Sequence, residues 1–211
     1  MEVAERLYAE RGVNGVSLRE IGAAAGQRNT GVVRYHFGSK ARLLDAVFRR
    51  RMEPINERRE AMLAALDAEG RGLDLRGLAE AFLYPLADEL GEPGRPSWYL
   101  RFCVHAAYVE GTAPTALGRD PWTRGVRDLQ RRFETVLVDL GIPAELHDDR
   151  WSAFCGHVAH ALADREHVLE HGPRRGGTDR ALFLAGLVDT AVALAAAPVS
   201  DRTAQLLRRT A

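Results

Sequence analysis

The chain has 211 residues, 46% of them hydrophobic, and its formal charge at pH 7 is zero. This composition is enough for an ordinary globular core, and Cys103 and Cys155 stand outside any C-x-x-C pattern, which favours reduced thiols. No apolar run approaches the roughly 20 residues of a transmembrane helix, and the N-terminal stretch MEVAERLYAERG lacks a signal-peptide core. We therefore expect a cytoplasmic protein without a membrane partner or a cofactor.

The first two predicted helices follow from apolar spacing and from capping residues. One covers residues 2–11, and Gly12 fits the position that ends it. The next begins at Ser17, where Glu20 three residues later completes a capping box.

Two further helices complete the N-terminal segment. A short one covers about 30–36 with Asn29 as its N-cap, and Ser39 caps another. The apolar stripe of that last helix consists of Leu43, Leu44, Val47 and Phe48.

Beyond residue 51 the predicted helices are longer, and no convincing alternating strand occurs. They lie near residues 53–69, 74–91, 96–111, 120–140, 147–170 and 178–197. The pattern therefore predicts an all-α protein.

Charge is unevenly distributed along these helices. Residues 1–51 hold ten basic and five acidic residues, a net charge of +5, and the rest of the chain has a net charge of −5. A basic segment joined to an acidic remainder is typical of a protein that binds phosphate groups with its basic end.

The segment from Ser17 to Lys40 has the layout of a helix-turn-helix, whose second helix lies in a DNA major groove. Arginine there can bond guanine with two hydrogen bonds, and asparagine can do the same with adenine. Lys40, beside the Ser39 hydroxyl and free backbone donors, would make a phosphate clamp; the alternative is a solvated lysine at a helix start. The exposed candidates on the second helix are Arg28, Asn29, Thr30, Gly31, Arg34 and Tyr35.

At these residues the stretch GVNGVSLREIGAAAGQRNTGVVRYHFGSKARLLDAVF resembles the N-terminal domain of TetR-family transcriptional regulators. The Ser-Leu-Arg-Glu-Ile-Gly run, the Ala-Gly turn and the His-Phe-Gly-Ser-Lys junction match in order and spacing. The resemblance implies a three-helix DNA-binding domain, here residues 1–51, and a larger helical ligand-binding and dimerisation domain, residues 52–211. It also implies a homodimer and a repressor that a small-molecule effector releases from a palindromic DNA operator.

The chain departs from the family pattern at two places. Arg34 stands where many members have tyrosine, and the turn before Asn29 is one residue longer than the commonest form. Tyr35 or His36 would then take the phosphate contact of that tyrosine. The candidate DNA contacts are Ser17, Arg28, Asn29, Thr30, Gly31, Arg34, Tyr35, His36 and Lys40.

The helix near 96–111 is rich in aromatic rings, which suits either a ligand pocket or core packing. Arg101 and His105 could hold a polar end of the ligand. The candidate pocket residues are Trp98, Arg101, Phe102, His105, Tyr108 and Trp122.

The last two predicted helices carry apolar stripes that suit a dimer interface, with a purely intrachain core as the alternative. The candidate interface residues are Trp151, Phe154, Val158, Leu162, Leu184, Leu187, Val188 and Ala191. Four histidines on the same helices, His157, His160, His167 and His171, lack an acidic partner motif, so we expect no metal site.

Two other classes of function compete with a DNA-binding regulator. An enzyme is disfavoured because the chain has no G-x-S-x-G, H-E-x-x-H, P-loop or G-x-G-x-x-G motif. A helical scaffold that has lost DNA binding is disfavoured by the basic face between Arg28 and Lys40.

Overall fold

The computed structural model of the chain describes residues 1–27, 31–92, 96–107, 123–172 and 178–210. Helices make up 79% of these described residues, in which no strand occurs, and this confirms the predicted all-α fold. The helices are α1 (Glu2–Arg11), α2 (Leu18–Ala24), α3 (Val32–Phe37), α4 (Lys40–Ala68), α5 (Leu75–Ala87), α6 (Tyr99–Ala107), α7 (Arg124–Asp139), the short 3-10 helix η3 (Ala144–Leu146), α8 (His147–His171), α9 (Arg180–Ala196) and α10 (Asp201–Thr210).

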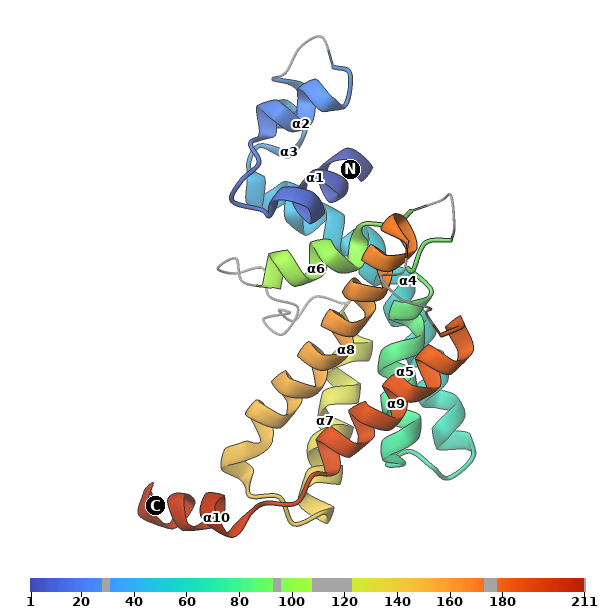
Figure 1. The fold of residues 1–211 in the computed structure, drawn as a ribbon, viewed down its shortest axis with the longest axis vertical. Helices are drawn as coiled ribbons and strands as arrows, with labels where there is room; N and C mark the ends of the chain where they lie inside the picture. The colour runs from blue at the N-terminus through green and yellow to red at the C-terminus, as the bar shows by residue number, and fades with distance from the viewer. Residues whose placement is uncertain (28–30, 93–95, 108–122, 173–177, 211) are drawn as a thin grey trace.

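The molecule is elongated, with α1, α2 and α3 at one end and α10 at the other (Figure 1). We call residues 1–51 the head and residues 52–211 the body. The long helix α4 belongs to both, because it starts beside α3 and continues into the bundle of α5, α7, α8 and α9 (Figure 1). A change in the tilt of α4 therefore moves the head relative to the body.

Helix α4 is one 29-residue helix, although the sequence predicted two helices, the second of them near 53–69. Pro54 lies inside it and removes one backbone donor, but its side chain is exposed. Buried Met52 and Ile55 flank the proline and continue the apolar stripe of Val47 and Phe48. Packing along this stripe holds the helix together across the proline.

The core of the body is an aromatic cluster that we call the body cluster: Phe82 of α5, Phe133 of α7, and Trp151 and Phe154 of α8. Ring centroids of its neighbouring members lie 5.0 to 5.8 Å apart. Edge-on and tilted ring contacts of this kind add to the stabilisation from apolar burial. The cluster joins three of the helices that surround α4.

Helix α10 was not predicted. The Ser200 hydroxyl accepts from the Thr203 backbone N–H at 3.3 Å, and Asp201 in the first turn and Arg208 in the last complement the helix dipole. Across the described residues no single helix has the length and apolarity of a membrane span. Helices α9 and α10 reach that length only together, and they bend by 46° at the break between them.

Candidate functional site

Helix α2 begins with the capping box that the sequence predicted. The Glu20 backbone N–H donates to the Ser17 hydroxyl at 3.2 Å, and the Ser17 backbone N–H donates to the Glu20 carboxylate at 2.8 Å. Arg11 donates to the same carboxylate at 2.8 Å. Hydrogen bonds from Ser17, followed by that from Arg11, lower the pKa of Glu20 to about 2. Ser17 therefore fixes the start of α2 and is itself exposed.

Helix α3 presents a polar, exposed face at the end of the head. Arg34, Tyr35 and His36 are all exposed, and Tyr35 shows 86% of its surface to solvent. The Tyr35 and His36 rings meet edge to face with centroids 5.5 Å apart. Gly31 is the exposed N-cap position of this helix. The other predicted members, Arg28, Asn29 and Thr30, lie outside the described residues.

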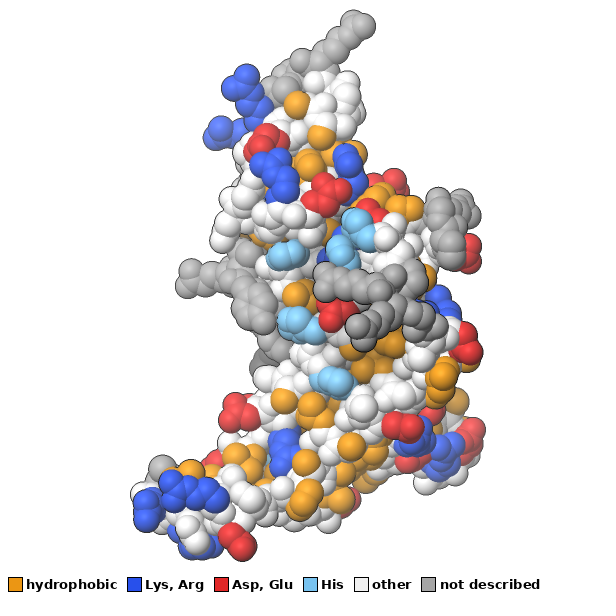
Figure 2. Space-filling model, in the orientation of Figure 1, with side chains coloured by type: hydrophobic (Ala, Val, Ile, Leu, Met, Phe, Trp, Pro, Cys, Tyr) orange, Lys and Arg blue, Asp and Glu red, His pale blue; other side chains and the backbone are white. Residues whose placement is uncertain are grey.

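A depression of about 370 Å³ separates the start of α2 from α3. Its walls are Leu18, Arg19, Gly31, Arg34 and Gly38. Two arginines thus border one hollow, and basic side chains stand out at this end of the molecule in Figure 2. The sequence analysis missed Arg19. This residue lies two positions after the Ser17 cap, on the exposed side of α2.

Lys40 connects two parts of the head. Its ammonium donates to the Val13 carbonyl at 2.8 Å, in the turn between α1 and α2. The Ser39 hydroxyl accepts from the Arg42 backbone N–H at 3.2 Å, as expected of an N-cap. An ammonium has three donors, so the contact with Val13 leaves two for a phosphate.

Helix α6 joins the head to the body through Phe102. This ring has no exposed surface and lies between Phe48 of α4 and Tyr8 of α1, with centroid distances of 4.8 and 6.0 Å. The burial of Phe102 between these rings favours the core alternative over a place in the wall of a ligand pocket. A fully buried ring on the apolar side of α6 faces away from solvent, whereas Arg101 and His105 occupy the other side.

A second contact between head and body is ionic. The Arg51 guanidinium donates to Glu5 of α1 at 2.9 and 3.1 Å and to Glu89 at 3.0 Å. It also lies over the Tyr99 ring, 5.7 Å from the centroid. Burial raises the pKa of both Glu5 and Glu89, against the opposing effect of Arg51. One cation therefore serves two carboxylates from different parts of the chain.

Helix α6 is anchored to α8 by Glu166, which is 1% exposed. Its carboxylate accepts from the backbone N–H groups of Leu100 and Arg101, both at 3.1 Å, and from the Arg101 guanidinium at 3.0 Å. The Trp98 indole N–H donates to the carboxylate of Glu170, also on α8, at 3.3 Å. Arg101 and Trp98 are thus engaged with α8, while Tyr108 and Trp122 lie outside the described residues.

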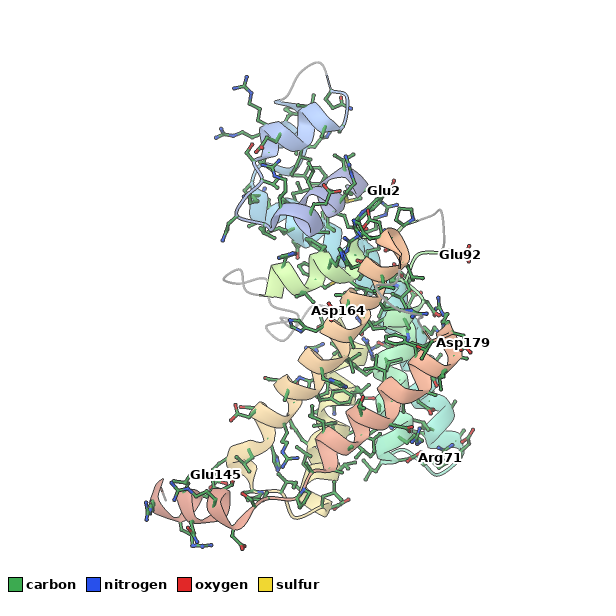
Figure 3. The ribbon with its side chains drawn as sticks, viewed as in Figure 1. Glu2, Arg71, Glu92, Glu145, Asp164 and Asp179 are labelled. Atoms are coloured by element: carbon green, nitrogen blue, oxygen red, sulfur yellow. The ribbon has the colours of Figure 1, made fainter. Side chains whose placement is uncertain are left out.

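A hollow of about 550 Å³, which we call the junction cavity, lies where α1, α6 and α8 meet. Arg101 and His105 line it, and Asp164, labelled in Figure 3, lies on its α8 side. The other wall residues are Ala9, Glu10, Val104, His160, Ala163, His167, Glu170 and His171. Charged side chains and histidines predominate among these wall residues, and Phe, Tyr and Trp do not occur among them. In the described ranges no three His, Cys, Asp or Glu side chains gather closely enough to hold a metal ion.

Most of the residues predicted to form a dimer interface are buried inside the chain. Those below one-tenth exposure are Trp151, Phe154, Val158, Leu162, Leu187, Val188 and Ala191, and Leu184 is half-buried. These stripes pack against α5, α7 and each other, which favours the intrachain alternative for them. The outward side of α9 instead carries Leu182, Ala185 and Gly186, and hydrophobic side chains gather over α8 and α9 in Figure 2.

Arg59 is a polar core residue that the sequence reasoning missed. It is 1% exposed and sits on the buried stripe of α4 between Ile55 and Leu63. The signal was available, because an arginine four residues from each of two core aliphatic positions must face the core if the helix is continuous.

Residues 1–47 match the family model described as bacterial regulatory proteins, tetR family. The match covers α1, α2, α3 and the first turns of α4, which is the part of the chain that carries the capped helix-turn-helix. A search of curated proteins found no match to the chain.

Proposed function

We propose that this chain, a DNA-binding transcriptional regulator of the TetR family, is a cytoplasmic repressor that a small-molecule effector releases from a near-palindromic operator. The observation that carries the proposal is the exposed face of Arg34, Tyr35 and His36 on the second helix of a capped helix-turn-helix. Residues 1–51 supply the net charge of +5 that attracts phosphate. Repression follows when the occupied operator overlaps the promoter.

The proposed readout divides the head residues by chemistry. Arg28, Asn29 and Arg34 read base edges, because their side chains can form paired hydrogen bonds with guanine or adenine. Thr30, Tyr35, His36 and Lys40 hold phosphates, and Gly31 allows the helix to approach the duplex closely. Ser17 acts through the cap of α2.

Two copies of the chain would present two α3 helices to successive major-groove turns of one operator. We place the dimer contact on the outward sides of α8 and α9. A Cβ added at Gly156 or Gly186 would meet no atom within 4 Å, so these helix positions are open to a partner helix. Leu182, 60% exposed, provides an apolar contact on the same side of α9. An isologous pairing of this face gives the twofold symmetry that a palindrome requires.

The effector would bind in the junction cavity, where Arg101 and His105 hold its polar groups. This position supports allostery because the cavity wall includes Ala9 and Glu10 of the head as well as α6 and α8 of the body. An effector that prefers one head position over the other by roughly 1–3 kcal/mol changes operator affinity about 5- to 150-fold.

The test of DNA binding is a gel shift with the DNA upstream of the chain's own gene, with and without unlabelled competitor. Retardation that specific competitor removes and random competitor leaves supports a sequence-specific regulator. Absence of any shift at low salt, where phosphate contacts are strongest, would favour the scaffold reading.

A further inference from the structure

One side of helix α10 is both basic and apolar, and it faces solvent. Arg202, Leu206 and Arg209 lie on this side, because residues three and four positions apart are neighbours on a helix surface. All three side chains are exposed, and Leu206 shows 45% of its surface to solvent. Thr203 and Leu207, on another side of the helix, are half-buried. We call the row of Arg202, Leu206 and Arg209 the arm face.

The rest of the chain supports α10 only weakly. A helix of ten residues is marginal in water unless another surface packs against it. Within the described residues no other helix packs extensively on α10, which lies at the end of the molecule opposite the head (Figure 1). In the same ranges Arg202 and Arg209 form no ion pair. The arm face is therefore open to a partner.

The end of α7 lies at the same end of the molecule as α10 (Figure 1) and also exposes apolar side chains. Val138 is 63% exposed and Leu140 is 48% exposed, and the Asp139 side chain between them is exposed as well. Glu145, labelled in Figure 3, and Asp148 add two exposed carboxylates at the start of the next helices. We call these five residues the tip. Among the described residues no basic side chain forms an ion pair with a carboxylate of the tip.

The arm face and the tip are complementary, because one is basic, the other is acidic, and each has exposed aliphatic side chains. In the proposed dimer both heads contact one operator, so the twofold axis runs along the length of the molecule and both tips lie at the same end. Helix α10 follows α9, and the tip precedes α8. A contact between α10 and the tip of a second copy would therefore continue the interface proposed for α8 and α9.

We propose that α10 is a docking arm that binds the tip of a second copy of this chain. Arg202 and Arg209 face Asp139 and Glu145 of the partner subunit, and Leu206 packs against Leu140 of the partner subunit. The twofold axis repeats the contact, so each dimer holds two. The proposal rests on the proposed dimer, in which both heads point the same way, and is independent of the effector.

Disulfide cross-linking of the full-length protein tests the contact. Chains with Leu206→Cys are mixed with chains with Leu140→Cys, left to exchange subunits, and treated with a mild oxidant. We expect a covalent dimer on a non-reducing gel, because a disulfide requires Cα atoms within about 7 Å. In the matched control Leu73→Cys replaces Leu140→Cys, since Leu73 is 47% exposed on the turn between α4 and α5. Wild type controls for Cys103 and Cys155.

A covalent dimer in the mixture, and in neither variant alone, supports docking of α10 on the partner. A covalent dimer of Leu206→Cys alone would mean that α10 meets α10. An intrachain disulfide in a chain with both substitutions, without the covalent dimer, would mean that α10 covers its own tip. Either result would overturn the proposal, and so would a mixture that forms no more cross-link than the Leu73→Cys control.

Charge reversal measures the ionic part of the contact. Arg202→Glu combined with Arg209→Glu should raise the dissociation constant of the dimer about 10-fold in light scattering, since reversed charges meet the tip at two places in each dimer. Adding Asp139→Arg and Glu145→Arg to the same chain should restore most of the affinity, as expected of directly interacting positions. Failure of the second pair to restore dimerisation would refute the pairing of these charges.

Arg49→Glu combined with Arg71→Glu is the control, because both arginines are exposed and the change in net charge is the same. A dimer that keeps its wild-type affinity after charge reversal on α10 contradicts the docking arm and leaves the contact of α8 and α9 standing. A dimer that cross-links as expected but binds no operator supports the docking arm and contradicts the proposed function. A wild-type chain that stays monomeric contradicts both the arm and the proposed dimer.

Discussion

The Lys40 ammonium lies 2.8 Å from the Val13 carbonyl and so ties the start of α4 to the turn between the first two helices. Lys40→Ala should weaken binding to operator and random DNA alike and reduce the salt slope by about one, because a phosphate contact carries no sequence information. Loss of the bond to Val13 should also lower the free energy of unfolding by about 0.5–1.5 kcal/mol.

Fluorescence anisotropy at several salt concentrations measures the effect of Lys40→Ala on DNA binding. Arg71→Ala, at an exposed body position, is the control and should leave the slope unchanged. A wild-type slope in Lys40→Ala would mean that its ammonium serves only the fold.

Arg34→Ala should relax the preferred base at one position of each half-site and cost about 1–3 kcal/mol of operator binding. The reason is that Arg34 is exposed on α3, the helix expected to enter the major groove. Selection from random DNA provides the measurement, with Arg28→Ala and Asn29→Ala alongside. Identical consensus sequences for wild type and all three variants would refute base reading by these side chains.

The proposed dimer face is tested by Gly156→Arg combined with Gly186→Arg. A Cβ added at either position meets no atom within 4 Å in its own chain, and arginine favours a helix over glycine by about 0.8–1 kcal/mol per position. The double variant should therefore fold and become monomeric in light scattering. Ala64→Arg, at an exposed position of α4, is the matched control. A dimer that persists in the double variant would move the interface to another surface.

Glutamates at Leu187 and Val188 would not test that face. Both side chains are buried within the chain, Leu187 at 5% and Val188 at 0% exposure. Charges there have no partner and would unfold the body of each copy.

Acid should weaken the head through Glu20. Its pKa in the folded state is about 2, below the ordinary 4.5, so the carboxylate stabilises the folded state above about pH 4.5. This contribution is lost as the pH falls from about 4.5 through 2. Urea unfolding of wild type and Glu20→Gln across this range measures it, and the variant should show a flatter profile. Glu57→Gln, at an exposed position of α4, is the control.

Phe102→Ala should lower the free energy of unfolding by about 3–5 kcal/mol, because the ring is fully buried between Phe48 and Tyr8. A ligand-pocket wall would instead tolerate truncation. Thermal or urea unfolding distinguishes the two cases, and a loss below about 1 kcal/mol would be too small for a core ring.

Local signals predicted two of the three caps in the head, but the N-cap of α3 is Gly31 and not Asn29 as predicted. The caps at Ser17 and Ser39 depend on hydrogen bonds within three residues, and both occur as expected. Helix continuity across Pro54 was not predictable in the same way, because it depends on the burial of Met52 and Ile55 against distant helices.

The candidate sites in the body were harder to predict, since apolar spacing does not say which neighbour covers a helix. Leu187 and Val188 read equally well as interface or core, and only the packing of α9 onto α5 and α8 decides. The burial of Arg59 could not be predicted while two separate helices were expected, because it follows from the continuity of α4 and the burial of its apolar stripe.

Glu166 limits how α6 can move. Its buried carboxylate accepts hydrogen bonds from the backbone N–H groups of Leu100 and Arg101 in the first turn of α6. Sliding α6 along its axis would break these bonds and leave the Glu166 carboxylate buried without them, which is costly. A swing about that turn keeps them. The far end of α6 brings His105 to within 3.8 Å of a Cβ placed on Gly12, at the close of α1. We therefore expect any displacement of α6 relative to α8 to be a rotation about its first turn, which would move His105 against the end of α1.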